Sequence, residues 1–478
     1  MDASSVRILW QKAIDIAEQT EDFLQQFEGS SKDSPIFVIN DTSAGKGLKL
    51  RVTVRAGYYG PGKTGDDLFN ANTDYEQDLI NHYEVDLDYL RNATTINQRT
   101  DEYMGMQGEL NSGQVEELGK WMGREKTARA FMSFRLKGGA QNLIFSNRKT
   151  IDTLVSADGL TYNDILYMGQ ALKPLGGTPA SVATVRGVPV RKYIVIGATP
   201  GLFSLKQDSD YKLIVKDAMP REKWDENPLF QGGYAELDGH SIREFNPIDH
   251  DGYGPVGSPM NAKAFLGAAI TAGTAAFTMY GGGSATAAVV TNSVYFRYFD
   301  GYAFPFIPGD TYTPAANTTR YLLVINPSNA TTDPGKFSMY SYTTGNTGNT
   351  IAITGRLGPS NAGIQVSTLG SVTWNAGVWA TVGHTQNNPI GATVVQCNAY
   401  GTPIGRTFML GARAMIRGYG MWRNHRSQML WEGDFQTRKF ITSVFGQTLR
   451  TNANGVIPGY VQMVHALSYP ELGIPTIV

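Results

Sequence analysis

The chain contains 478 residues, a length that suits two or three domains better than one small core. Lysine and arginine number 41 against 42 aspartates and glutamates, so the formal net charge of −1 excludes a protein that coats nucleic acid through a basic surplus. The single cysteine, Cys397, excludes an internal disulfide framework and a zinc site built from cysteines.

No segment has the composition of a membrane span or of an export signal. The first residues lack a basic start followed by an apolar run. The most apolar stretch, Phe265 to Thr278, is too short and too rich in glycine and threonine to cross a bilayer. We therefore expect a protein that is not exported and has no membrane partner.

Residues 1–40 are predicted to form an N-terminal arm. Apolar residues recur at helical spacing from Val6 to Phe27, and the segment SSKDSP then breaks this pattern. An extended run begins at Pro35. The partner face of the helix is unclear from the sequence, so we expect an arm that packs on a neighbouring subunit.

Residues 41–100 are predicted to form a long hairpin-like loop. Strict alternation of apolar and polar residues between Leu48 and Arg55 indicates a strand with one wet face. A glycine-rich tip, GYYGPGKTG, follows, and an ordered segment returns from Leu79 to Leu90. A loop of this length is unusual in a compact domain unless it has a task, and contact with a neighbouring subunit is one such task.

The tip also matches a nucleotide-binding motif. Gly57 to Thr64 fits the G-x-x-x-x-G-K-[ST] pattern of a P-loop, whose backbone cradles phosphates. The preceding strand is amphipathic, whereas a P-loop strand lies in a parallel sheet covered on both faces. Asp66 and Asp67 follow, where phosphates would need a helix N-terminus. A P-loop enzyme therefore stays an alternative hypothesis, and a glycine-rich loop tip is the favoured interpretation.

The region 101–139 contains the longest predicted helix, Asn111 to Lys137. Apolar residues including Val115, Trp121 and Phe131 follow the helical period, and charged residues, among them Glu116, Glu117, Lys120, Arg124, Lys126 and Arg129, are predicted to lie mostly on the other side. Asn111 is the predicted N-cap, and Gly138–Gly139 is the predicted stop. At about 1.5 Å per residue the rod is about 40 Å long, which suits a spine on which other layers rest.

Residues 140–262 are predicted to form an α/β domain. Segments 152–156 and Thr161 to Leu172 predict another short helix, with Thr161 or Ser156 near its start, and a buried strand is expected at 186–196. The segment 200–216 is interpreted as a turn, a short helix and the approach to another strand. Asp238–Gly239 between two extended runs predicts a two-residue hairpin.

Residues 263–402 differ in composition from the rest and are predicted to form an inserted β-rich domain. Between 265 and 400 only seven residues are Asp, Glu, Lys or Arg. Short β-rich runs separated by Gly, Pro and Asn predict a sandwich-like domain or a small barrel of about seven strands. A trimeric β-rich adhesin or fibre with a helical base is a further hypothesis for such a chain.

Residues 403–478 are predicted to return to the core fold, with strands at 437–445 and 460–466. The similarity between 262–270 and 406–415 is interpreted either as the edges of one interrupted element or as chance likeness between small-residue helices. A mildly basic, aromatic region is interpreted as an inter-subunit patch or, alternatively, as a nucleic-acid contact; it comprises Arg413, Arg417, Tyr419, Trp422, Arg423, Arg426, Trp431 and Arg438.

The sequence assembles no active site. None of the six histidines forms an H-x-x-x-H or H-E-x-x-H pattern, and no G-x-S-x-G elbow is present. Asp249, His250 and Asp251 form either a metal site or, as their Gly/Pro-rich surroundings favour, a polar turn. We expect no enzyme activity, no cofactor and no metal.

Three segments together carry a family resemblance. They are the run from DLDYLRNATTINQRTDEYMGMQGEL through the predicted spine helix, the run NPLFQGGYAELDGHSIREF, and GRTFMLGARAMIRGYGM with DFQTRKFITSVFGQTL. These resemble the major capsid proteins of tailed bacteriophages of the N-four-like family. The resemblance covers most of residues 35–262 and 403–470, and residues 265–400 depart from the pattern.

The resemblance implies an α+β phage major capsid protein fold of the Hong Kong ninety-seven type. Such a fold has an N-terminal arm, an extended β-hairpin loop, a spine helix, and peripheral and axial domains, to which this chain adds the β-rich insertion. It implies a coat protein that assembles into homo-pentamers and homo-hexamers of an icosahedral shell. Packaged double-stranded DNA would be held by confinement, with a portal protein and scaffold or decoration proteins as further partners. The protein would be made in the host bacterial cytoplasm and reside in the virion capsid.

The predicted inter-subunit contacts follow from the extended loop and the spine. They are Leu48, Leu50, Arg51, Val52, Val54, Arg55, Tyr58, Tyr59, Lys63 and Trp121. Some members of the wider fold crosslink a lysine to an asparagine, but no Glu-Lys-Asn arrangement can be matched here by position.

Overall fold

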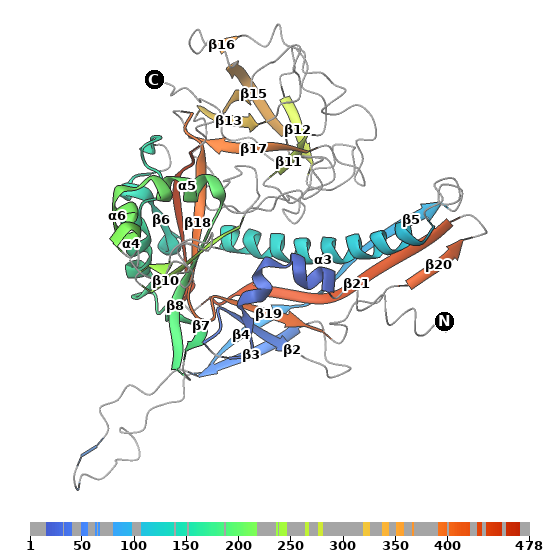
Figure 1. The fold of residues 1–478 in the computed structure, drawn as a ribbon, viewed down its shortest axis with the longest axis horizontal. Helices are drawn as coiled ribbons and strands as arrows, with labels where there is room; N and C mark the ends of the chain where they lie inside the picture. Colours follow the sequence, from blue (N-terminus) through green and yellow to red (C-terminus); the bar gives the residue numbers. More distant parts are fainter. Residues whose placement is uncertain are drawn as a thin grey trace.

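The computed structural model of this chain combines one long helix with three large β-sheets and a two-stranded hairpin (Figure 1). It describes residues 16–31, 33–40, 49–55, 63–64, 66, 80–97, 107–137, 140–150, 153–185, 188–217, 236–237, 239–245, 263–266, 276–280, 319–325, 337–343, 350–357, 366–367, 391–398, 401–420, 428–432, 436–451 and 456–468.

The first sheet, here the ribbon sheet, is built around one strand. β21 runs for 14 residues, pairs with β5 over ten positions, and pairs with β20 and β19 along its other edge. The strand order is β1-β2-β19-β21-β20, with β5 on β21. The strands are β1 (Glu28–Gly29), β2 (Ile36–Asn40), β5 (Asp88–Asn97), β19 (Met415–Tyr419), β20 (Gln428–Glu432) and β21 (Gln436–Leu449).

Helix α3 (Gln107–Lys137) lies along this sheet (Figure 1). Its 31 residues give a length of about 46 Å. Near its start Val115, Leu118 and Met122 pack with Leu90 and Ile441 of the ribbon sheet. Near its end, Ala130, Phe131 and Phe134 join a second apolar cluster that includes strands of the next sheet. One helix therefore supports two sheets, as predicted for a spine.

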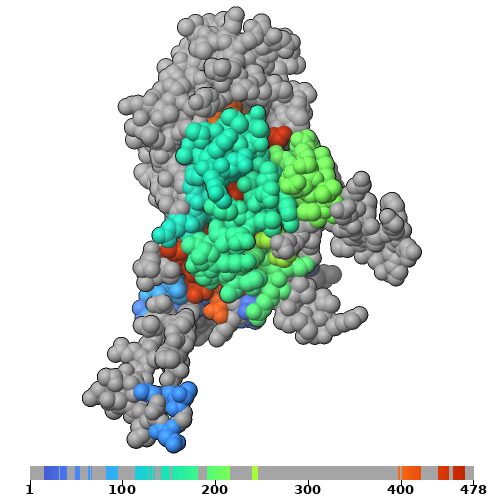
Figure 2. Space-filling view, turned by 90° about the vertical axis from the view of Figure 1, so that its left-hand side faces the viewer, coloured from blue at the N-terminus to red at the C-terminus, as the bar shows by residue number. Residues whose placement is uncertain are grey.

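The second sheet, here the α/β sheet, has the order β6-β22-β18-β8-β10-β9, with β7 on β8. Its strands are β6 (Leu143–Phe145), β7 (Ala180–Val185), β8 (Val188–Gly197), β9 (Glu236–Leu237), β10 (His240–Glu244), β18 (Ile404–Leu410) and β22 (Tyr460–Ala466). Helices α4 (Tyr162–Leu172), α5 (Thr199–Gln207) and α6 (Ser209–Asp217) cover one face, where their apolar side chains pack on Val195, Met409 and Met463. Figure 2 shows this outer face, with α5 and α6 beside α4.

The third sheet is formed by strands between 263 and 397. Its order is β12-β11-β17-β13-β14-β15-β16, and β12 pairs with β15 as well as β11. This extra pairing closes a ring of antiparallel strands, as in a small barrel, so of the two predicted arrangements the ring replaces the sandwich. The strands are β11 (Lys263–Leu266), β12 (Ala276–Tyr280), β13 (Thr319–Ile325), β14 (Phe337–Thr343), β15 (Thr350–Leu357), β16 (Val366–Ser367) and β17 (Gly391–Cys397).

Several predicted elements are confirmed with their expected chemistry. Thr161 caps α4: its hydroxyl accepts a hydrogen bond from the backbone N–H of Asp164, and the Asp164 carboxylate accepts one from the backbone N–H of Thr161. This pair of bonds is a capping box. β9 and β10 pair across a two-residue turn in which Gly239 has a φ of +77°. β3 (Lys49–Arg55) and β4 (Ile80–Asp86) pair in antiparallel register as a hairpin.

Other predicted boundaries are wrong. Asn111 does not cap α3, because the good helix formers Gln107 and Leu110 extend the helix upstream of it. Asp22 interrupts the predicted arm helix, which is helical at 16–21 and continues as the 3-10 helix η1 (Phe23–Phe27). The segment 209–217, predicted as the approach to a strand, is instead helix α6.

The two similar segments 262–270 and 406–415 are not one element. The first contributes β11 to the barrel and the second contributes β18 to the α/β sheet, and neither strand is helical. Their likeness therefore has no structural counterpart. The predicted polar turn or metal site at 249–251 lies outside the described residues.

Candidate assembly elements

The hairpin and the N-terminal arm lie on opposite faces of the ribbon sheet. Alternation along a strand places successive side chains on opposite faces. On β19, Ile416 packs with the hairpin residues Leu50 and Val85. Its neighbours Met415 and Arg417 contact the arm and α3. The described part of the arm, which the sequence predicted to pack on a neighbouring subunit, thus packs on α3 and the ribbon sheet of its own chain.

The hairpin has one buried and one exposed face, as the alternation in β3 predicts. Leu50 is buried with Tyr83 and Val85 of β4, and Val52 is half-buried beside them. On the exposed face, the guanidinium of Arg51 lies 3.0 Å from Glu84, and Lys49 lies 3.2 Å from Asp86. These ion pairs are solvent-exposed and contribute little to stability.

The predicted inter-subunit contacts are therefore distributed over different environments. Leu50 and Val52 pack within the chain, and Trp121 is half-buried against the cluster that holds α3 on β5 and β21. Arg51 and Lys63 are exposed. Val54 and Arg55 lie in β3, whereas Leu48, Tyr58 and Tyr59 lie outside the described residues.

The arm segment, residues 16–28, is held by ion pairs as well as by the buried side chains of Leu24 and Phe27. It contains four acidic residues and no basic residue. Glu21 pairs with Arg124 of α3 at 3.2 Å, and Glu18 pairs with Lys126, whose side chain is almost completely buried. The arm backbone also approaches α3 closely, because a Cβ at Gly123 would lie 2.5 Å from the carbonyl oxygen of Glu18.

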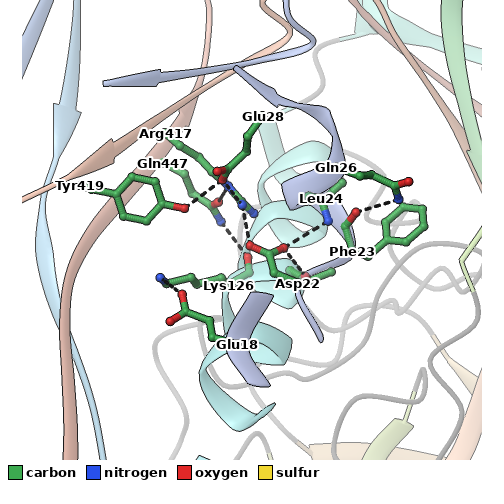
Figure 3. A network of polar contacts seen from close by, with 11 residues as sticks. Glu18, Asp22, Phe23, Leu24, Gln26, Glu28, Lys126, Arg417, Tyr419 and Gln447 are labelled. Carbon is green, nitrogen blue, oxygen red and sulfur yellow. Dashed lines mark hydrogen bonds and ion pairs between the residues drawn. The ribbon is translucent and has the colours of Figure 1, made fainter. Parts of the chain in front are cut away.

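A buried ionic network joins this segment to the ribbon sheet (Figure 3). The fully buried Arg417 Nη1 lies 2.7 Å from Asp22 Oδ2 and 2.6 Å from Glu28 Oε1. Thr127 donates its hydroxyl hydrogen to Asp22 Oδ1 at 2.8 Å, and Tyr419 donates to Glu28 at 2.9 Å. Buried charges need such partners, because an unpaired one would be strongly destabilising.

Protonation in this network follows from burial and charge. Burial alone would lower the pKa of the Arg417 guanidinium, but the charges of Asp22 and Glu28 raise it above its ordinary value. Burial also raises the pKa of the Tyr419 phenol well above its ordinary value, and Glu28 adds to this effect. Arg417 therefore stays charged and Tyr419 stays a donor throughout the neutral range.

Lys126 occupies an aromatic setting in the same layer. Its ammonium lies 4.9 Å from the ring centroid of Tyr419 and 5.1 Å from that of Phe445. Cation–π attraction and the pair with Glu18 compensate its lost hydration. The prediction that Lys126 lies on the exposed side of the helix is wrong, because the arm covers that side.

The predicted basic patch is also partly wrong. Arg417 and Tyr419 are buried in the ionic network and cannot meet a nucleic acid or another subunit. Arg413 is half-buried, and its backbone N–H donates to the carbonyl of Ser34. The tryptophans and the other arginines of the patch have side chains outside the described set. The sequence signal that was overlooked is the acidic arm itself, which requires basic partners.

The described residues bear on the P-loop and metal-site hypotheses in two ways. β3, which precedes the P-loop-like segment, belongs to a two-stranded antiparallel hairpin and not to a parallel sheet. Among described residues, no cluster of three or more histidine, cysteine, aspartate or glutamate side chains is placed to hold a metal ion. None of the described helices is long and apolar enough to cross a membrane.

Comparison with known proteins identifies the fold. No protein-family model matches the chain, and no curated protein matches its sequence. The capsid of Ralstonia phage GP4 matches 94% of this chain and 92% of its own, with a TM-score of 0.53 and 11% identity. The capsid asymmetric unit of cyanophage Pam1 also matches 94% of this chain and 92% of its own, with a TM-score of 0.50 and 12% identity. This chain therefore has the mixed α and β fold of phage capsid proteins.

Proposed function

We propose that this chain is a major capsid protein that assembles into the icosahedral shell of a tailed bacteriophage. The observation that carries the proposal is the likeness to two phage capsid structures over 94% of the chain. The proposed role is structural and needs no cofactor.

The finer assignment is the Hong Kong ninety-seven type of coat fold, in the N-four-like family. α3 would be the spine helix, the β3–β4 hairpin the base of the extended loop, and the α/β sheet the axial domain. Residues 263–402 would be an inserted domain. Homo-pentamers and homo-hexamers would form the shell, because many modest contacts repeated by symmetry give a stable assembly.

The partners follow from this assignment. Double-stranded DNA would be enclosed by confinement, which suits a chain whose formal net charge is −1. A portal protein would occupy one vertex, and scaffold or decoration proteins would act during or after assembly. The subunits would be made in the host cytoplasm and finish in the virion capsid.

Negative-stain electron microscopy and sedimentation of the concentrated full-length protein test the proposal. We expect shells, sheets, or rings with five- or six-fold symmetry. Trimers at every concentration, with and without a co-expressed scaffold, would contradict it and favour the fibre hypothesis. Binding of ATP with Mg²⁺ at millimolar concentration that is lost in Lys63→Ala would instead favour the P-loop enzyme.

A further inference from the structure

β19 carries the arm on one face and the hairpin on the other. Met415, Arg417 and Tyr419 face the arm and α3, whereas Ile416 and Gly418 face the hairpin. The strand is also paired on both edges, with β2 and β21. A change in its position would therefore reach both elements.

The direct ionic contact between the arm and β19 is made by Arg417. Arg417 is the only base paired with Asp22 and with Glu28 among the described residues. Asp22 also accepts from the backbone N–H of Leu24 at 3.2 Å, which fixes the start of η1. Loss of the Asp22 charge would thus loosen both the arm and the attachment of Arg417.

The contact on the hairpin side depends on close packing. A Cβ at Gly418 would lie 2.6 Å from Leu50 Cδ1 and 3.1 Å from Leu87 Cδ2, so the hairpin reaches the backbone of β19. Gly446 of β21 makes a similar approach, because its Cβ would lie 2.1 Å from the carbonyl oxygen of Asp86. Because the two are packed this closely, the sheet cannot shift without displacing the hairpin.

We propose that docking of the arm segment and seating of the hairpin are coupled through β19. The ionic network holds Arg417, and so holds β19 in the position that receives Leu50 and Leu87. Release of the arm loosens the base of the hairpin, and by linkage a loosened hairpin weakens arm docking to the same extent. The inference rests on the proposed function in one respect: arm docking would then set the pose in which a subunit presents its hairpin to a neighbour.

Hydrogen exchange followed by mass spectrometry on the unassembled full-length chain tests this coupling. In Asp22→Asn we expect exchange of residues 16–28 to rise about tenfold or more, because a charged buried hydrogen bond is lost. Exchange of 49–55 and 80–86 should rise with it, while α4 at 162–172 keeps its parental rate. In Leu50→Ala, which removes the hairpin side chain that packs on Gly418, the arm should exchange faster in turn.

Two matched controls separate coupling from general destabilisation. Asp33→Asn removes an exposed pair with Arg191, and Leu213→Ala shortens a leucine that is 60% exposed on α6. Both should leave the arm and hairpin unchanged. Thr127→Val removes only one hydrogen bond to Asp22 and replaces Asp22→Asn if that variant fails to fold.

The proposal would be overturned if exchange of the arm rose while exchange of the hairpin kept its parental rate. It would also be overturned if loosening one element sped up exchange of the other but not the reverse. The measurement uses unassembled subunits, so its outcome is independent of shell formation. A chain that forms no shells can still show the coupling, and a chain that forms them can lack it.

Discussion

Arg417 is the residue on which the connection between the arm and the ribbon sheet depends most. It is fully buried, and its two carboxylate partners come from a segment much earlier in the chain. Asp22 precedes it by 395 residues and Glu28 by 389. A buried ion pair is weak evidence for stability when compared with an apolar replacement of the whole pair. Breaking it from one side is different, because two carboxylates are then left without a counter-charge.

We therefore expect Arg417→Met to lower the free energy of unfolding by about 3–5 kcal/mol. The matched control is Arg191→Met, which removes an exposed pair with Asp33 and should cost at most about 1 kcal/mol. Denaturant unfolding followed by fluorescence measures both values. Equal losses in the two variants would show that the buried network contributes no more than a surface ion pair.

His465 gives the folded chain a dependence on pH. Burial lowers the pKa of its imidazole, although the carbonyl of Ala466 and the charge of Asp164 act in the opposite direction. The ring also lies 2.9 Å from the hydroxyl of Thr407. The unfolded chain binds a proton near pH 6.5, whereas the folded chain does so only at lower pH.

The stabilising contribution of neutral His465 is therefore complete above about pH 6.5 and is lost as the pH falls toward the folded-state pKa. The limiting slope is about 1.4 kcal/mol per pH unit. His465→Gln, which cannot titrate, should show a flatter profile between pH 7.5 and pH 5.5 when unfolding is measured across that range. Parallel profiles for the two proteins would contradict this assignment.

At the scale of elements, local patterns predicted what local physics decides. The alternation in β3, the helix start at Thr161 and the turn before His240 each depend on a few neighbouring residues, and the structure confirms them. The burial of Lys126 and Arg417 was not predictable in the same way. The helical period describes one apolar side of α3, but it cannot indicate that a distant acidic segment covers the opposite side.

The arm on α3 predicts opposite outcomes for two glycines in one helix. A Cβ at Gly123 would lie 2.5 Å from Glu18 O and 3.0 Å from Asp22 N, both backbone atoms that cannot turn aside. A Cβ at Gly113 would meet nothing within 4 Å. Alanine is the better helix former at a position with free space.

We expect Gly113→Ala to raise the free energy of unfolding by about 0.5–1 kcal/mol. We expect Gly123→Ala to lower it by about 1–3 kcal/mol, as overpacking does, and to expose Phe23 and Phe27 of the arm to chymotrypsin. Equilibrium unfolding and limited proteolysis of the two variants measure these effects. Stabilisation by both substitutions would mean that the arm does not lie on this part of α3 in solution.

At the scale of the whole molecule, α3 and β21 connect parts that the sequence presents separately. β21 pairs with β5 and β19, and α3 packs on both the ribbon sheet and the α/β sheet. The barrel strands join only one another in their ladders within the described residues. The resemblance of three sequence segments predicted this fold class, and composition predicted a β-rich character for the insertion. Neither predicted that the arm and hairpin would share one strand.

The hairpin allows assembly to be separated from folding. Arg55 and Ile80 are paired directly at the end of the β3–β4 ladder. Residues 56–79 can therefore be replaced by Asn-Gly, which closes a two-residue hairpin turn without changing the register. The apolar contacts of Leu50 and Val85 with the ribbon sheet remain.

If the extended loop reaches a neighbouring subunit, this variant should fold and fail to assemble. We expect its free energy of unfolding to stay within about 0.5 kcal/mol of the parent value, the usual range for changes away from a core. Sedimentation should show single subunits under conditions in which the parent forms shells or rings. The control for altered surface chemistry is the double variant Arg51→Glu with Glu84→Arg, which reverses the exposed ion pair and so preserves it. Normal assembly of the shortened chain would place the contacts between subunits elsewhere, with α3 and the α/β sheet as the next surfaces to test.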